Sequence, residues 1–157
     1  MEKGCAHLDV QIFEVTSESQ KQQALQIRKI VFVEEQHVPE SLELDEYDTH
    51  SETSHWLLTV NKQPIGTARF RPYQLQTIKI ERVAILQEAR GQGYGEALMR
   101  AMEAQARKRG FIKARLNAQI QALAFYEKLN YLPIGERFEE AGILHQTMEK
   151  DISHFVL

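Results

Sequence analysis

The sequence predicts one α/β domain, of the α+β kind, with flanking helices on a mixed and mostly antiparallel sheet. Strand-like segments at 55–60, 65–71 and 77–85 follow one another, and the polar segment 61–64 is typical of a hairpin turn. A long helix and a further strand come next, and a strand, helix and strand in this order favour a right-handed parallel unit. Because 157 residues suit one core, we expect residues 1–157 to form a single domain.

The N-terminal third predicts a strand, a helix and an irregular acidic segment. Residues 8–15 largely alternate apolar with polar side chains, as a half-buried strand does. Ser17 or Ser19 can cap the next element, and apolar residues recur at mostly helical spacing over 22–33. Pro39 and the polar, acidic residues up to Thr53 then interrupt regular structure. We expect this segment to be an active-site loop with room for a short helix.

The C-terminal half predicts a second sheet-covering helix and the remaining strands. Leu98, Ala101 and Met102 set an apolar stripe on a helix that Gly110 is placed to end. The segment 112–118 then predicts a strand. A short helix over 122–129 and strands near 132–137 and 145–150 complete the chain.

Composition indicates a soluble globular protein. A hydrophobic fraction of 43% and a charged fraction of 26% are close to the averages for such proteins. The net charge of −3 argues against a nucleic-acid partner, which requires a basic surface. No segment has the length and apolarity of a signal peptide or a membrane span, so we expect a cytoplasmic protein with no membrane partner.

The cysteine and the histidines predict neither a disulfide nor a metal site. The single cysteine, Cys5, has no partner cysteine and no neighbouring feature that would activate its thiol. His37, His50, His55 and His145 lack the His-x-x-x-His spacing that places two ligands on one helix face. We therefore expect no catalytic metal and no acyl-cysteine intermediate.

The most informative local pattern is the glycine-rich segment 90–95, Arg-Gly-Gln-Gly-Tyr-Gly, between a strand and a helix. Glycines let the backbone approach a ligand closely, and the helix start offers unpaired N–H groups and a partial positive charge, a combination that binds phosphate. By itself the motif is equally consistent with a purely structural turn. No Gly-Lys-Ser/Thr sequence follows, which disfavours a nucleotide triphosphatase, and the position after several antiparallel strands fits a dinucleotide fold badly.

In its wider context this segment resembles a known cofactor motif. The run 80–99 closely resembles the acyl-CoA-binding motif of the GNAT superfamily of N-acyltransferases, whose pattern Arg/Gln-x-x-Gly-x-Gly/Ala is met by Arg90, Gly93 and Gly95. Asn117 and the segment 124–131 resemble the second motif of the superfamily, in the expected order and spacing. Two motifs in order are much more specific than one.

Two further segments, 31–36 and 138–145, look like the ElaA-like subgroup of the superfamily and extend the resemblance over nearly the whole chain. Gln87 and Leu144 depart from it, since each stands where proline is frequent. The resemblance implies a GNAT-like fold in which the parallel strands 77–85 and 112–118 splay apart. It also implies acetyl-CoA, or another acyl-CoA, as co-substrate. The residues it assigns to the acyl-CoA are Val83, Ala84, Ile85, Arg90, Gly91, Gln92, Gly93, Tyr94, Gly95 and Asn117.

The resemblance assigns the catalytic roles as well. Tyr126 matches the general acid that protonates the leaving thiolate, although without the motif a core tyrosine would be the better interpretation. Glu81 is the candidate base that accepts the ammonium proton directly or through water, against the simpler interpretation of a solvent-facing glutamate. A backbone N–H near Val83 or Ala84 is expected to stabilise the oxyanion.

The acceptor is the least specified part of the prediction. In the acidic stretch, Glu43, Asp45 and Asp48 can form a site for a cationic acceptor, although a solvated loop explains the same charges. His145 can line this pocket, or be an ordinary strand histidine. We expect an N-acyltransferase that moves acetyl from acetyl-CoA to a primary amine of a small molecule or peptide by direct attack in a ternary complex. The alternatives are a non-catalytic acyl-CoA-binding sensor and an interaction module. A homodimer through edge strands stays open.

Overall fold

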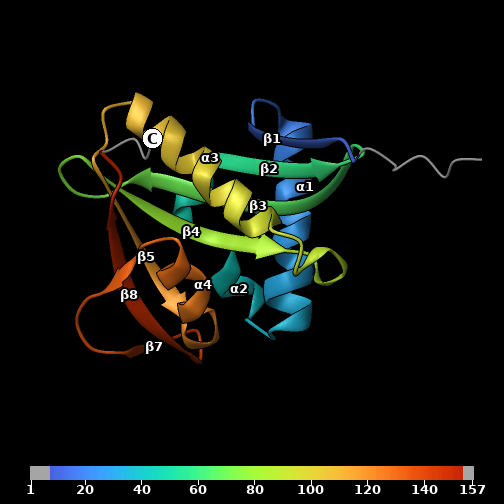
Figure 1. The fold of residues 1–157 in the computed structure, drawn as a ribbon. Helices are drawn as coiled ribbons and strands as arrows, with labels where there is room; N and C mark the ends of the chain where they lie inside the picture. Colours follow the sequence, from blue (N-terminus) through green and yellow to red (C-terminus); the bar gives the residue numbers. More distant parts are fainter. Residues whose placement is uncertain (1–7, 154–157) are drawn as a thin grey trace, which may run out of the picture.

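The structure, a computed structural model, describes residues 8–153 and is built on one eight-stranded sheet (Figure 1). The strands follow the order β1-β2-β3-β4-β5-β8-β6, and β7 pairs with β8. Their bounds are β1 Val10–Glu14, β2 Ser54–Val60, β3 Gln63–Pro72, β4 Thr77–Ile85, β5 Lys113–Gln119, β6 Leu132–Pro133, β7 Phe138–Glu140 and β8 Ile143–Asp151. The pair β4–β5 is parallel and the other neighbours are antiparallel, which confirms the predicted mixed sheet.

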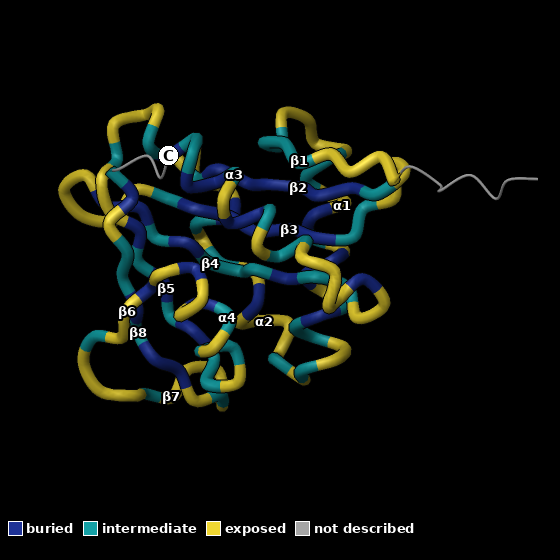
Figure 2. The backbone as a smooth tube through the Cα atoms, viewed as in Figure 1, coloured by how far each residue is buried: buried dark blue, intermediate teal, exposed yellow. Residues whose placement is uncertain are grey.

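Helices cover both faces of this sheet. Helix α3 (Tyr94–Lys108) packs Leu98 and Met102 into the core that contains Trp56 of β2. Helix α1 (Glu18–Arg28) packs Ile27 into a second core that contains Leu57 of the same strand. Since neighbouring strand residues point to opposite faces, α1 and α3 lie on opposite sides of the sheet, with the central strands buried between them (Figures 1 and 2).

Short elements surround the gap between β4 and β5. Helix α1 continues directly into the π-helix η1 (Lys29–Glu35). The others are α2 (Glu40–Glu43), η2 (Glu46–Asp48), η3 (Gln87–Ala89), η4 (Ile120–Ala122) and α4 (Leu123–Lys128). The expected acidic loop over 39–53 therefore contains two short helices, η2 being closed by a capping box between Asp45 and Asp48.

The element boundaries differ from the sequence prediction at several places. The first helix begins at Glu18 rather than residue 22, because Ser17 Oγ accepts a hydrogen bond from the Gln20 N–H at 3.2 Å and caps it. It leaves α-geometry at Lys29, which the apolar spacing did not indicate. Near the C-terminus, the strand predicted at 132–137 is reduced to the two residues of β6, and β7 is a separate strand.

A buried polar contact joins α3 to the C-terminal strands. The Tyr131 hydroxyl, in a fully buried residue, donates to Glu103 Oε2 at 2.6 Å, and Lys150 Nζ lies 2.7 Å from Glu103 Oε1. The Tyr131 ring also meets the ring of Tyr126 edge-on, with 5.9 Å between centroids. Tyr131, held in place by Glu103, therefore supports the position of the Tyr126 ring.

Replacing Tyr131 with Phe leaves the buried Glu103 carboxylate with one partner fewer. We expect the free energy of unfolding in urea to fall by about 1–3 kcal/mol, the usual loss for a buried polar group left without its hydrogen bond. Tyr73→Phe is the matched control, since Tyr73 is 40% exposed. Equal unfolding curves for the two variants would show that the Tyr131 hydroxyl contributes nothing.

Candidate active site

The candidate site is a cavity that forms where β4 and β5 separate. The two strands pair over four residues each, from Thr77 with Lys113 to Ile80 with Leu116, and the pairing stops there. A cavity of about 880 Å³ begins where they separate. Its lining comes from both sides of the sheet, with Phe32 on the α1 side and Phe125 on the α3 side. It therefore passes through the sheet.

The glycine loop forms one end of the cavity. Gly91 and Gly93 have φ angles of 78° and 83°, a left-handed conformation that favours glycine, and Gly93 is the N-cap of α3. A Cβ on Gly95 would come within 3.1 Å of the Phe125 ring, so α3 begins in close contact with α4. The first-turn N–H groups of α3 have no intrahelical partner and lie beside the cavity, as an anion site requires.

Most of the ten residues predicted to bind the acyl-CoA line this cavity. Of the ten, all but Gln92 line the cavity, and Gln92 is exposed. Asn117 Oδ1 accepts a hydrogen bond from Thr147 Oγ1 at 2.9 Å, which leaves the Asn117 N–H groups for a ligand. The structure therefore gathers residues of β4, the glycine loop and β5 along one cavity.

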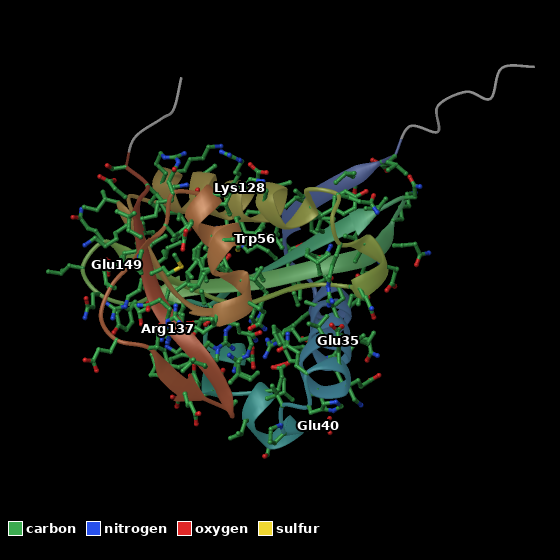
Figure 3. All side chains as sticks on the ribbon, turned by 60° about the horizontal axis from the view of Figure 1, so that its bottom comes forward. Glu35, Glu40, Trp56, Lys128, Arg137 and Glu149 are labelled. Atoms are coloured by element: carbon green, nitrogen blue, oxygen red, sulfur yellow. The ribbon has the colours of Figure 1, made fainter. Side chains whose placement is uncertain are left out.

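The Arg90 side chain contacts both the end of β4 and η1. Its Nε donates to the Ile85 carbonyl at 2.9 Å, and its two Nη groups donate to the Glu35 carboxylate at 2.7 and 2.8 Å. The hydrogen bond from Arg90 lowers the pKa of Glu35. Arg90 thus connects the glycine loop to the end of β4 and to η1. Glu35, on η1, is labelled in Figure 3. Apart from the ElaA-like segment 31–36, no sequence pattern predicts the pairing of Arg90 with Glu35.

A second contact joins η1 to the opposite rim of the cavity. Gln119, the last residue of β5, donates from Nε2 to Gln36 Oε1 at 2.9 Å. Gln36 follows η1 directly, and both glutamines line the cavity. Residues 35 and 36 therefore contact the end of β5 directly and the end of β4 by way of Arg90.

Tyr126 lies on α4 against the cavity wall. Tyr126 is 8% exposed and lines the cavity. Its ring packs edge-on against the Phe125 ring, with 4.9 Å between the centroids. Burial raises the pKa of Tyr126 well above its usual value, so the phenol is protonated at neutral pH. Within residues 8–153, no hydrogen bond engages its hydroxyl, which leaves this proton for a ligand.

A β-bulge in β4 turns consecutive side chains to the same side of the sheet. From Thr67–Ala84 to Arg69–Glu81, β3 advances by two residues and β4 by three, so β4 carries one extra residue. Arg82 sits at the bulge with φ of 58°. Glu81 and Arg82 both contact groups on the α1 side, whereas Val83 joins the α3-side core. Beyond the bulge, Val83 to Ile85 border the gap left by β5.

The acidic segment is bound to buried arginines. Arg28, 1% exposed, contacts Glu43 Oε2 and Asp48 Oδ1 at 2.6 Å each. Arg69, fully buried, contacts Asp48 Oδ1 and Asp45 Oδ2 at 2.7 Å each. Burial raises the pKa of Asp48, but the hydrogen bond and charge of Arg28 outweigh it and leave that pKa well below its usual value.

This arrangement argues against the predicted cationic acceptor site. Asp45 and Asp48 are absent from the cavity lining within the described residues, and Glu43 reaches the lining already paired with Arg28 and Arg82. A carboxylate held by guanidinium groups has little attraction left for a second cation. We therefore revise the interpretation of Glu43, Asp45 and Asp48 from acceptor ligands to partners of these arginines.

Glu81 and His145, the other predicted groups, do line the cavity. Glu81 accepts hydrogen bonds from Arg69 Nη2 at 3.0 Å and Arg71 Nε at 2.8 Å. Burial raises the pKa of Glu81, but the Arg71 hydrogen bond and the Arg69 charge outweigh it and leave the pKa below its usual value. His145 Nδ1 lies 2.7 Å from the Ile143 carbonyl, which can only accept, so Nδ1 carries the proton.

Residues 8–153 contain neither a candidate metal site nor a membrane-spanning helix. No group of three or more histidine, cysteine, aspartate or glutamate side chains in residues 8–153 could hold a metal ion. In the same residues, no helix is long and apolar enough to cross a membrane. Cys5, for which the sequence predicted no catalytic role, lies outside the described residues.

The fold and the cavity together match the acyl-CoA N-acyltransferase class that the motifs indicated. Residues 14–152 match the acetyltransferase (GNAT) domain family, and the chain belongs to this family. It is 38% identical over 136 residues to the uncharacterised N-acetyltransferase YjcF of Bacillus subtilis, and the match covers 86% of this chain and 95% of that protein.

Solved structures of other proteins also indicate this family. The chain is similar to Escherichia coli ElaA, with a TM-score of 0.81 and 27% identity over 92% of this chain and all of that one. It is similar to an acyl-CoA N-acyltransferase from Pseudomonas aeruginosa, with a TM-score of 0.80 and 27% identity over 92% of this chain and 99% of that one. The predicted resemblance to the GNAT superfamily and its ElaA-like members is confirmed.

Replacing Arg28 with Met removes one partner from two buried carboxylates, Glu43 and Asp48. We expect the free energy of unfolding to fall by about 3–5 kcal/mol, as is usual when one member of a buried ion pair is removed. The neighbouring Lys29→Met is the control, because Lys29 is half exposed and reaches Glu40 only at 3.9 Å. Similar small losses in both variants would mean that the cluster does not stabilise the fold.

Proposed function

We propose that this protein transfers an acetyl group from acetyl-CoA to a primary amine by direct attack within a ternary complex. The observation that carries the proposal is the cavity between β4 and β5, with the glycine loop at one end and the Tyr126 side chain in its wall. Because the cavity is lined from both sides of the sheet, two substrates can approach each other through it from opposite faces.

The described residues fit an acyl-CoA. On this proposal the N–H groups of Gln92 to Gly95 bind the pyrophosphate, supported by the positive end of α3. Backbone groups of Val83 and Ile85, and the Asn117 amide, bind the pantetheine arm. Arg90 acts through the backbone, since its side chain is already bound to Glu35 and Ile85.

The chemistry needs an electrophile, a neutral amine and a proton for the leaving group. The thioester supplies the electrophilic carbonyl. The amine nitrogen forms the new C–N bond, the C–S bond breaks, and the Tyr126 hydroxyl donates its proton to the departing thiolate. On this proposal the N–H of Val83 or Ala84, both residues of the cavity wall, binds the oxyanion. The phenolate regains a proton from solvent after release of the products.

Glu81 faces the incoming amine on this proposal. Its carboxylate is kept ionised by Arg69 and Arg71, so it accepts a hydrogen bond from the neutral amine, and the proton that the amine loses passes to water rather than staying on Glu81. His145 lies on another part of the same wall and presents Nε2 as a hydrogen-bond acceptor when the ring is neutral.

Calorimetric titration with acetyl-CoA, followed by a thiol-release screen over a broad panel of amines, tests the function. We expect micromolar to submillimolar binding and release of free thiol with at least one class of amine. Absence of binding at millimolar acetyl-CoA would end the proposal. Binding without turnover of any amine would instead support the non-catalytic sensor that the sequence left open.

Tyr126→Phe removes the proposed proton donor while keeping the ring that packs against Phe125 and Tyr131. We expect kcat to fall by roughly 100-fold or more, the usual contribution of a general acid, and the Kd for acetyl-CoA to stay within about twofold. The exposed Tyr73→Phe serves as control. A parallel loss of kcat and of acetyl-CoA binding would show that the tyrosine only shapes the site.

Because the pKa of Glu81 is lowered, we can predict how the contribution of Glu81 to activity depends on pH. A carboxyl group whose pKa in the folded protein lies below 4.5 stays ionised at every pH above that value. We therefore expect Glu81→Gln to lower kcat/KM by a factor that is constant from pH 6 to pH 9. If the wild type instead shows an acidic limb in this range that the variant lacks, Glu81 is a titrating base and the inference is wrong. Acetyl-CoA affinity of the variant reports whether the site is intact.

A further inference from the structure

The buried ion-pair cluster beside the cavity holds one more cation than anion. Each of its members pairs only with other members in the ion pairs among residues 8–153. The five cations are Arg28, Arg69, Arg71, Lys79 and Arg82, and the four carboxylates are Glu43, Asp45, Asp48 and Glu81. A buried surplus charge is unfavourable unless a counter-ion approaches it.

Four side chains of this cluster, two of each charge, reach the cavity. The cations Lys79 and Arg82 line it together with the carboxylates Glu43 and Glu81, whereas Arg28, Arg69 and Arg71 lie behind it. The two lining cations also have the longest contacts in the cluster. Lys79 Nζ lies 3.8 Å from Glu81 Oε2, and Arg82 reaches Glu43 Oε2 and Asp45 Oδ2 at 3.3 Å each. Both therefore retain donor capacity on the side of the cavity.

The backbone at Arg82 gives independent support. Its φ of 58° is a left-handed conformation, and among residues 8–153 it is the one non-glycine residue inside a strand that adopts it. Glycine would adopt this conformation without strain, and strained positions of this kind cluster at functional sites. The bulge turns the Arg82 side chain to the α1 side, next to Glu81.

Other charges of the lining do not cancel the surplus. Arg90 is paired with Glu35, and Glu96 with Arg100, at 2.7 and 2.8 Å. Lys128 and Glu140 line the cavity as well, both are exposed, and their charges offset one another. The net charge next to Glu81 therefore remains that of the cluster.

We propose that the acceptor is a small amine that also carries a carboxylate, of the amino-acid type, and that Lys79 and Arg82 bind this carboxylate while Glu81 faces the amine. The inference rests on the proposed acyl transfer and narrows its acceptor. An anion at this point completes the cluster, because five cations then face five carboxylates. Polyamines and aminoglycosides would add positive charge where a surplus already exists, so they are poor acceptors.

The test compares acceptors that differ in one charge. Thiol release from acetyl-CoA is measured with α-amino acids, with their α-amides, and with spermidine. We expect kcat/KM to be at least about tenfold higher for the best amino acid than for its amide, since a charge-assisted bond is lost in the amide. The comparison is conservative, because the amide has the less basic amine and therefore more of it in the reactive neutral form.

Arg82→Gln then tests the assigned side chain. We expect the KM for the amino acid to rise about tenfold or more, the preference over the amide to disappear, and the Kd for acetyl-CoA to stay within about twofold. Lys79→Gln is the second variant, with a smaller effect in the same direction, and it leaves the bulge unchanged. Arg137→Gln, an exposed arginine outside the cavity lining, is the matched control.

The possible outcomes distinguish a failure of the carboxylate site from a failure of the proposed acyl transfer. Faster turnover of amides or of spermidine than of every amino acid overturns the carboxylate site and leaves the acyltransferase proposal intact. Binding of acetyl-CoA with no turnover of any amino acid overturns it as well. Failure to bind acetyl-CoA at all contradicts the proposed function itself. Loss of discrimination in Arg82→Gln with unchanged acetyl-CoA affinity supports both.

Discussion

The structure depends on one constraint, the end of pairing between β4 and β5 after Ile80 and Leu116. Two neighbouring strands that part leave backbone N–H and C=O groups without ladder partners, and such groups are unfavourable when no other partner reaches them. In this protein the gap is the cavity, so the unpaired edges face a space that a ligand's amides can enter. The site is therefore a consequence of the sheet topology and not an addition to it.

The parting is maintained from both faces of the sheet. On the α3 side, Gly95 permits close contact with Phe125, which brings α4 and Tyr126 to the gap. On the α1 side, the bulge at Arg82 and the buried arginines attach β4 to the acidic segment. On the proposed function, one face supplies the group that protonates the leaving thiolate, and the other face supplies charged groups that bind the acceptor. Opposite chemistry on opposite faces suits a transfer between two substrates.

Patterns local in sequence were predicted well, and contacts between distant segments were not. Most strands and the glycine loop at the start of α3 follow from periodicity and glycine spacing, and Asn117 and Tyr126, which the second motif singled out, line the same cavity. The acidic segment was misinterpreted because its partners Arg28 and Arg69 lie 15 to 24 residues away in sequence. Charge alone shows that carboxylates are present, whereas their availability depends on tertiary pairing. The Glu35–Arg90 contact, 55 residues apart, was missed for the same reason.

The contacts of η1 with both rims of the cavity have a consequence for how such an enzyme can diversify. Glu35 holds the loop after β4 through Arg90, and Gln36 holds the end of β5 through Gln119. The aperture between the strands is therefore spanned by a segment near the start of the chain, far in sequence from the glycine loop. A change confined to residues 35 and 36 can therefore alter the size of the opening, and hence the molecules admitted, while the sequence of the glycine loop stays the same.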